Sequence, residues 1–223
     1  MFLQTHYSIL NATGKVKDVL ARVKELDYKV AIISDNNLFG TLEFYYQAKK
    51  EGIMPIISVR TVIEGVSFIL LAKNENGYKN LSRMSKYEEP TLELLKEHSE
   101  DVVVIIDFDN LDAQALEKAK DYANFAGIKV VRTVEDKVKD SLIRSLNLPL
   151  VPVETAKYIH KEDYRNLIAL QAIDGKTLYE NGAIQKQQTE DYIKEKSYFL
   201  NTYPQEIKNL SKIIAECTDD YKF

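Results

Sequence analysis

Histidines and carboxylates that follow predicted buried strands are the side chains of this sequence that could do chemistry. His6 follows a short apolar run at the N-terminus, Asp35 follows YKVAIIS, and Asp107 opens the stretch DFDN after VVVII. Imidazole and carboxylate groups are typical ligands of divalent metal ions in proteins. The pattern therefore raises the hypothesis of a metal-dependent hydrolase whose site begins at His6.

The sequence offers few ligands for such a site. It has three histidines, His6, His98 and His160, and its single cysteine, Cys217, lies at helical spacing from apolar neighbours and is expected in the core. An aspartate after a buried strand, such as Asp35, is more often a turn former or helix cap than a metal ligand, and the same holds for DFDN. The sequence contains no glycine-rich phosphate loop, no GxSxG and no CxxC.

Composition sets the broad class of protein. The chain has 223 residues, 45% hydrophobic and 29% charged, with a formal net charge of -4. A free-standing nucleic-acid binder is usually basic, so we expect this chain to contact DNA only as part of a larger protein. No apolar run approaches the roughly 20 residues that cross a bilayer. The single cysteine fits a reducing compartment, so the expectation is a cytoplasmic protein without membrane contact.

Strand and helix patterns alternate along most of the chain. Alternation at this spacing predicts a mainly parallel sheet covered by helices, either an open doubly wound sheet or a barrel. Strands are predicted at residues 28–34, 53–60, 66–72, 102–106, 128–131 and 150–153, with a hairpin turn at 64–65. Helices are predicted at residues 16–26 behind an N-cap at Thr13, then at 40–52, 74–85, 91–98, 112–126 and 135–146.

The pattern becomes helical after residue 153. Further helices are predicted at residues 162–173, 189–196 and 204–217, with a polar connector at 182–188. We therefore divide the chain into a βα body over residues 1–160 and a helical extension over residues 161–223.

Five separated stretches resemble one family. FILLAKNENGYKNLSRMS, NNLFGTLEFYYQAKKEGIMPIIS, HYSILNA, IHKED with AIDGKTL, and EIKNLSKIIAEC occur in the order of that family. The family is the N-terminal PHP (polymerase and histidinol phosphatase) domain of the alpha subunit of bacterial DNA polymerase III. The resemblance implies an α/β fold, a distorted TIM-like barrel of seven strands, in which the helical extension leads into the polymerase palm. The magnesium-binding aspartates of nucleotide transfer would lie in that palm, outside this chain.

PHP enzymes hold up to three divalent ions with His, Asp and Glu, and the resemblance shows which positions of this chain correspond to those ligands. Phe2 and Gln4 correspond to His-x-His, Arg60 to a glutamate, Ser67 to a histidine, and Thr155 and Lys157 to Asp-x-His. The Asp-His motif corresponds to Ser34 and Asp35, or to Asp35 and Asn36 if one residue is deleted, so its histidine is missing in either register and at most one carboxylate remains. Three histidines elsewhere cannot rebuild this cluster, so we expect no catalytic residue, metal or other cofactor in this chain. We expect Arg60 and Lys157 to pair with Asp35 or Asp107, although an anion at the barrel mouth is an alternative.

Three functions are compared. The leading hypothesis is a non-catalytic domain of a replicative DNA polymerase that scaffolds the palm and thumb and docks partners such as a proofreading exonuclease subunit. The alternative is a stand-alone metal-dependent PHP phosphoesterase or 3'-5' exonuclease, which would need the missing ligands. An interaction barrel unrelated to replication is the third, and the LLAKNENGYKNL and IIAEC segments weigh against it.

Overall fold

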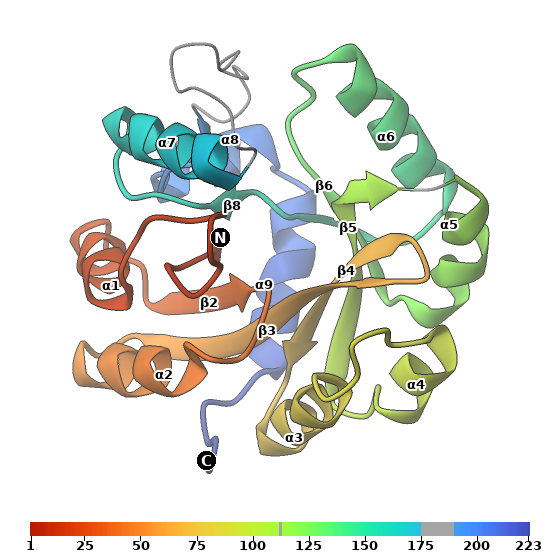
Figure 1. Cartoon of the computed structure of the whole chain (residues 1–223), viewed down its shortest axis with the longest axis horizontal. Helices are drawn as coiled ribbons and strands as arrows, with labels where there is room; N and C mark the ends of the chain where they lie inside the picture. The colour runs from red at the N-terminus through yellow and green to blue at the C-terminus, as the bar shows by residue number, and fades with distance from the viewer. Residues whose placement is uncertain (112, 175–189) are drawn as a thin grey trace. The chain divides into compact units, whose positions relative to one another are not determined.

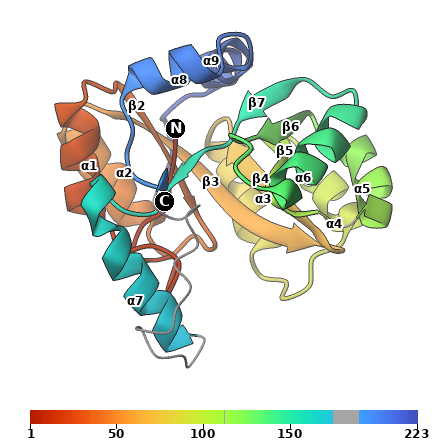
Figure 2. The same ribbon diagram turned by 90° about the horizontal axis from the view of Figure 1, so that it is seen from above.

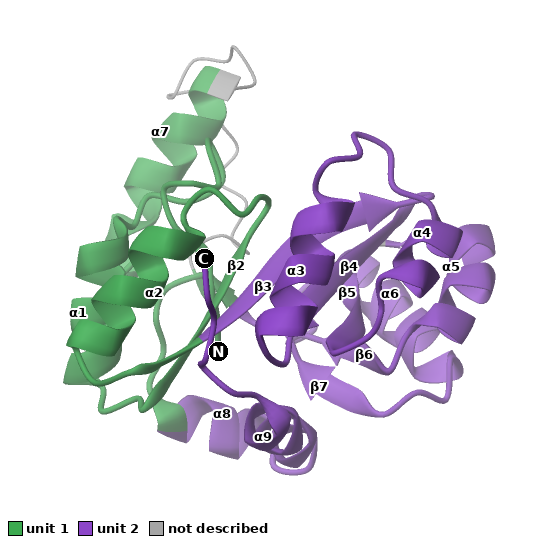
Figure 3. Ribbon diagram, turned by 90° about the horizontal axis from the view of Figure 1, so that it is seen from below, with its two compact units in different colours: residues 1–55, 155–196 green, residues 56–154, 197–223 purple. Residues whose placement is uncertain are grey.

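The computed structural model describes residues 1–111, 113–174 and 190–223. The predicted connector at 182–188 and part of AIDGKTL lie outside these residues. The described chain forms two compact units (Figure 3): unit 1 is residues 1–55 with 155–196, and unit 2 is residues 56–154 with 197–223. The predicted division into a βα body over residues 1–160 and a helical extension over residues 161–223 stays a prediction.

Unit 1 contains three short parallel strands in the order β8-β1-β2. The strands are β1 (Phe2–Leu3), β2 (Val30–Asp35) and β8 (Thr155–Ala156), and the helices are α1 (Val16–Glu25), α2 (Thr41–Lys50) and α7 (Tyr164–Asp174). Figure 1 labels all of these elements except β1. A short 3-10 helix, η2 (Lys161–Asp163), precedes α7. The apolar side of α1 is buried through Val16, Val19, Leu20 and Val23. Burial of such a stripe, rather than helix propensity, stabilises a helix of this length.

Unit 2 contains five strands in the order β7-β6-β5-β4-β3. They are β3 (Met54–Ile63), β4 (Val66–Ala72), β5 (Val102–Leu111), β6 (Phe125–Ile128) and β7 (Leu150–Pro152). The pairs β3–β4 and β4–β5 are antiparallel, whereas β5–β6 and β6–β7 are parallel. Among the described residues four of the six strand pairings within the two units are parallel, in agreement with the predicted mainly parallel sheet. Both antiparallel pairings involve β4, which follows the predicted hairpin at Glu64–Gly65 that reverses the chain without a crossover.

Helices cover the sheet of unit 2 (Figure 2). They are α3 (Glu75–Met84), α4 (Leu92–Glu97), α5 (Ala113–Ala119), the 3-10 helix η1 (Lys120–Tyr122), α6 (Val134–Ser145), α8 (Lys196–Thr202) and α9 (Glu206–Glu216). Helices α3, α5 and α6 pack against β4, β5 and β6, and α9 packs against β7. Strands flanked by helices in both units confirm the predicted α/β class. No described helix combines the length and the apolarity that crossing a membrane requires.

Several predicted boundaries were wrong. The helix expected at 112–126 ends at Ala119 and gives way to η1 and β6, because Phe125 and Ala126 pair with β5. Described residues 190–195 form no α-helix; Tyr192 instead makes a parallel bridge to Tyr158. The N-cap of α1 is Lys15 rather than Thr13. In each case tertiary pairing overrides a local pattern.

Candidate functional site

Three residues at the former ligand positions lie side by side at the carboxyl ends of the strands of unit 1. Leu3 is in register with Ile33 of β2 and with Ala156 of β8, so the next residues, Gln4, Ser34 and Lys157, are neighbours on one face. The backbone N–H of Gln4 donates to the backbone carbonyl of Ala156 over 2.8 Å, so the pairing of β1 with β8 continues at Gln4. The strand order thus brings together residues that are 153 positions apart in sequence.

Asp35 is held by donors from the loop after β1. Its Oδ1 accepts from the backbone amide of Thr5 over 2.7 Å and from the Ser8 hydroxyl over 2.6 Å. Its Oδ2 accepts from the Thr5 hydroxyl over 2.7 Å. Asp35 is buried and caps no helix, since the N-cap of α2 is Gly40. The expected helix-cap role was therefore wrong, and Asp35 instead fastens the loop.

The protonation of Asp35 reflects two opposing effects. Burial raises the pKa of the Asp35 carboxyl above its ordinary value, while the hydrogen bonds from Ser8 and Thr5 act in the other direction and do not cancel it. Both carboxylate oxygens are already engaged by loop donors. A divalent ion could bind this carboxylate only by displacing them.

The polar neighbours of Asp35 are also engaged within unit 1. Gln4 Nε2 donates to Asn36 Oδ1 over 3.1 Å, whereas buried Gln4 Oε1 and Ser34 Oγ have no hydrogen-bond partner in the described part of the chain. Lys157 forms an ion pair with Asp191, with 3.4 Å between Nζ and Oδ2. The structure thus shows a different partner for Lys157 from the expected Asp35 or Asp107, because the bridge between Tyr158 and Tyr192 brings Asp191 alongside it.

Arg60 forms an ion pair in unit 2, as predicted for this residue. Its guanidinium pairs with Asp107, and the two side chains are only 10% and 2% exposed. The Asp109 carboxylate also pairs with both cations: its Oδ2 lies 3.7 Å from the Arg60 guanidinium and its Oδ1 lies 2.8 Å from Lys129 Nζ. Burial opposes the charge of Lys129, but Asp109 and Asp107 outweigh it and raise the pKa of Lys129. Arg60 of β3, Asp107 and Asp109 of β5, and Lys129 just after β6 therefore neutralise one another as two cations and two carboxylates.

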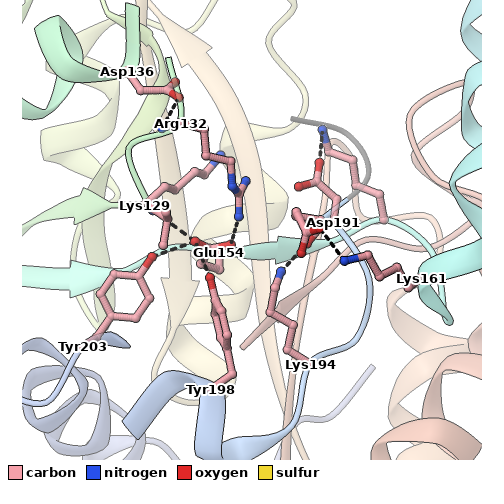
Figure 4. Close-up of polar contacts among 12 residues, drawn as sticks. Lys129, Arg132, Asp136, Glu154, Lys161, Asp191, Lys194, Tyr198 and Tyr203 are labelled. Carbon is pink, nitrogen blue, oxygen red and sulfur yellow. Dashed lines mark hydrogen bonds and ion pairs between the residues drawn. The ribbon is translucent and has the colours of Figure 1, made fainter. Parts of the chain in front are cut away.

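Sequence reasoning missed the network around Glu154, which comes two residues after β7 (Figure 4). Glu154 is buried and its Oε1 accepts from Tyr203 over 2.6 Å, from Tyr198 over 3.3 Å and from the amide of Val130 over 3.1 Å. The Arg132 guanidinium lies 3.6 Å from its Oε2. Burial and the negative charge of Glu154 raise the pKa of Tyr203, and the same causes raise the pKa of Tyr198 to about 12. The sequence signal that could have indicated this network is the acidic residue Glu154 directly after the strand predicted at 150–153.

The remaining singled-out residues have ordinary environments. Ser67 pairs with Val62 in the β3–β4 hairpin, and Thr155 pairs with Phe2. Exposed His6 contacts the ring of Tyr7, as expected of a loop histidine, and His98 is the C-cap of α4. Cys217 is buried, as predicted, and burial raises the pKa of its thiol to about 11.

The side chains at the positions that the resemblance aligns with metal ligands do not fit a divalent metal ion. Phe2 has no donor atom, the Asp35 oxygens are taken by the loop, and Arg60 is a cation paired with Asp107. Across residues 1–111, 113–174 and 190–223 no group of three or more His, Cys, Asp or Glu side chains has the arrangement of a metal site. The expectation that this chain binds no metal stays a prediction, and it is tested below.

Comparison with known proteins places this chain in a family. The family model described as PHP domain matches residues 2–111. The chain therefore carries a PHP domain. The alpha subunit of DNA polymerase III from Borreliella burgdorferi is 26% identical over 272 residues, an alignment that spans 100% of this chain and 24% of the relative. That of Thermus aquaticus is 28% identical, over 78% of this chain and 18% of the relative.

A third alpha subunit matches a shorter part of the chain. The alpha subunit from Helicobacter pylori 26695 is 36% identical over 125 residues, which is 46% of this chain and 10% of the relative. The PHP-bearing chain thus spans about a quarter or less of the curated relatives it matches. Among solved structures, an amidohydrolase from Chromobacterium violaceum has 10% identity and a TM-score of 0.49, covering 76% of this chain and 95% of that one. The predicted fold, an α/β fold of the distorted TIM-like PHP type, is confirmed, although the described residues form eight strands rather than the expected seven. This PHP domain is homologous to the N-terminal part of the polymerase subunit.

Proposed function

We propose that this PHP domain is a non-catalytic part of a replicative DNA polymerase. The observation that carries the proposal is the similarity to the Borreliella burgdorferi alpha subunit over the whole of this chain. Under this proposal nucleotide transfer and its magnesium ions belong to a palm domain beyond these residues. The PHP domain scaffolds that palm and the thumb, docks partners such as a proofreading exonuclease subunit, and meets DNA only through the complete protein in the cytoplasm.

The side chains at the former metal positions support the non-catalytic role. PHP hydrolysis needs clustered imidazole and carboxylate ligands, and here those positions hold an aromatic ring, an amide, hydroxyls, two cations and a single carboxylate, Asp35. Asp35 and Arg60 already have partners inside their own units. This arrangement favours a stabilised scaffold over the alternative of a metal-dependent phosphoesterase or 3'-5' exonuclease.

The test uses the full-length polypeptide that contains this chain. We expect it to extend a primed DNA template with magnesium, and we expect no phosphate release from a phosphate monoester and no nucleotide release from primer ends by the PHP domain with manganese or zinc. The matched variant is Asp35→Asn, which keeps the side-chain size. Primer extension that is absent from the wild-type protein, or metal-dependent hydrolysis that Asp35→Asn abolishes, would overturn the proposal.

A further inference from the structure

A surface pocket of unit 2 lies outside every position discussed above. Its volume is about 400 Å³, which is within the range of sites that hold a small ligand or a side chain. It lies between the end of α4 and η1, which pack against each other, and the start of β5. The lining residues are Lys96, Ser99, Val102, Val104, Asp121, Tyr122, Ala123 and Asn124.

The pocket has an apolar floor and a polar rim. Val102 and Val104 are buried residues of β5, whereas Asp121 at the rim is exposed. Tyr122 adds an aromatic ring, and its hydroxyl lies 3.4 Å from Glu93. A valine floor suits a methylene chain, while an aromatic face and a carboxylate suit a cationic group at the end of that chain.

The segment that contributes one side of the pocket is strongly acidic. Residues 86–101, which include α4 and contribute Lys96 and Ser99 to the pocket, contain two lysines and six acids, a net charge of -4. The whole chain has 30 basic and 34 acidic residues, so the other residues carry 28 of each and sum to zero. The negative excess of the chain therefore equals the net charge of the segment that leads into the pocket.

The acids of this segment are not neutralised within the described structure. Glu75 and Glu216 pair with lysines in the same unit, but no described residue forms an ion pair with Glu88, Glu89 or Glu97. These three glutamates are exposed. A concentration of unpaired negative charge beside a pocket with an apolar floor attracts a positively charged partner and repels anions such as phosphate.

We propose that this pocket docks a basic segment of a partner protein, with one lysine or arginine side chain inserted over Val102 and Val104 and its charge near Asp121. The proposal rests on the partner-docking role given above and identifies a surface for it. The cationic head would lie against Tyr122, and neighbouring basic residues of the partner would face the glutamates of α4. Lys96 opposes this partner, so its charge weakens the binding that the surrounding acids favour.

The experiment measures the affinity of the full chain for an acetylated and amidated octapeptide of alternating lysine and alanine. Two further peptides serve as controls: one with glutamate in place of lysine, and one with 2,3-diaminopropionate, which keeps the charge but shortens the stem. We expect binding of the lysine peptide, no binding of the glutamate peptide, and clearly weaker binding of the short-stem peptide. Equal affinity for the long and short stems would mean that nothing enters the pocket and would overturn the proposal.

Three variants locate the site. Asp121→Lys should weaken lysine-peptide binding about fivefold, because exposed charge pairs contribute up to about 1 kcal/mol each. Asp18→Lys, an equal charge change at an exposed residue of α1 in the other unit, should leave binding unchanged. Lys96→Gln should strengthen it.

Equal losses from Asp121→Lys and Asp18→Lys, or binding of inorganic phosphate that Lys96→Gln removes, would contradict the proposal. The readout is peptide affinity and needs no polymerase activity. Its failure is therefore distinguishable from a failure of the primer-extension test.

Discussion

At the residue scale, the ion pair between Arg60 and Asp107 is buried on both sides. Arg60→Ala would leave the Asp107 carboxylate without its main counter-charge in a place that water barely reaches. We expect the free energy of unfolding to fall by about 3 kcal/mol, the range found when one partner of a buried pair is removed. Urea unfolding measures this loss, and a chain as stable as the wild type would refute the assignment.

The matched control for Arg60 is Arg144, whose guanidinium pairs with Asp140 one helical turn away on α6. That arginine side chain is 50% exposed, so water already solvates it. Arg144→Ala should cost no more than about 0.5 kcal/mol. A similar loss in both variants would mean that burial does not govern the Arg60 pair.

Asp35 makes stability depend on pH with a defined sign. Its folded-state pKa lies above the ordinary value of 3.8 because of burial, so between those two pKa values the folded chain holds more protons than the unfolded chain. The stability contributed by this group is therefore complete below its ordinary pKa and is lost as the pH rises through the folded pKa. Asp35→Asn removes the titration. Urea unfolding from pH 4 to 7 should show the wild type losing stability relative to Asp35→Asn, and a gain instead would contradict the pKa direction.

At the element scale, the first turn of α3 depends on Gly77. The Asn74 side chain caps the helix by accepting from the Gly77 amide over 3.1 Å. A Cβ at residue 77 would overlap the backbone carbonyl oxygen of Asp101. Because this oxygen belongs to the backbone, it cannot move aside as the end of a flexible side chain could. Helix propensity alone predicts that Gly77→Ala stabilises α3 by about 1 kcal/mol. We expect the opposite sign in thermal unfolding, and a raised melting temperature would contradict the close approach.

The attachment of α8 to unit 2 depends on Tyr203, just beyond the end of that helix. Its hydroxyl donates to the buried Glu154 over 2.6 Å, whereas Tyr198 on α8 donates over 3.3 Å. Tyr203→Phe keeps the ring and should lower the free energy of unfolding by about 2 kcal/mol, because the hydrogen bond reaches a charged acceptor. Tyr198→Phe is the matched control and should cost less. The opposite order in urea unfolding would show that the longer bond is the stronger one.

At the scale of the whole molecule, we expect stability to be independent of divalent metals. The former ligand positions contain paired or non-ligating side chains, so zinc or manganese gains no differential affinity for the folded state. Melting temperatures measured with millimolar zinc, with manganese and with a chelator should coincide. A metal-dependent rise that Asp35→Asn removes would show that a metal site persists.

The sequence by itself determined the α/β class, the hairpin turn at Glu64–Gly65 and most of the strands and helices before residue 153, and its resemblance to the PHP family predicts where metal ligands are missing. These features depend on local patterns: apolar periodicity, a turn whose residues adopt positive φ (47° and 85°), and residue types at aligned motifs. The tertiary structure alone decided the partners of the charged groups. Asp35 accepts hydrogen bonds from hydroxyl groups rather than pairing with a cation, and Lys157 pairs with Asp191. Glu154 accepts hydrogen bonds from two tyrosines. Such partners are distant in the chain, and strand register, which no local pattern specifies, brings them together.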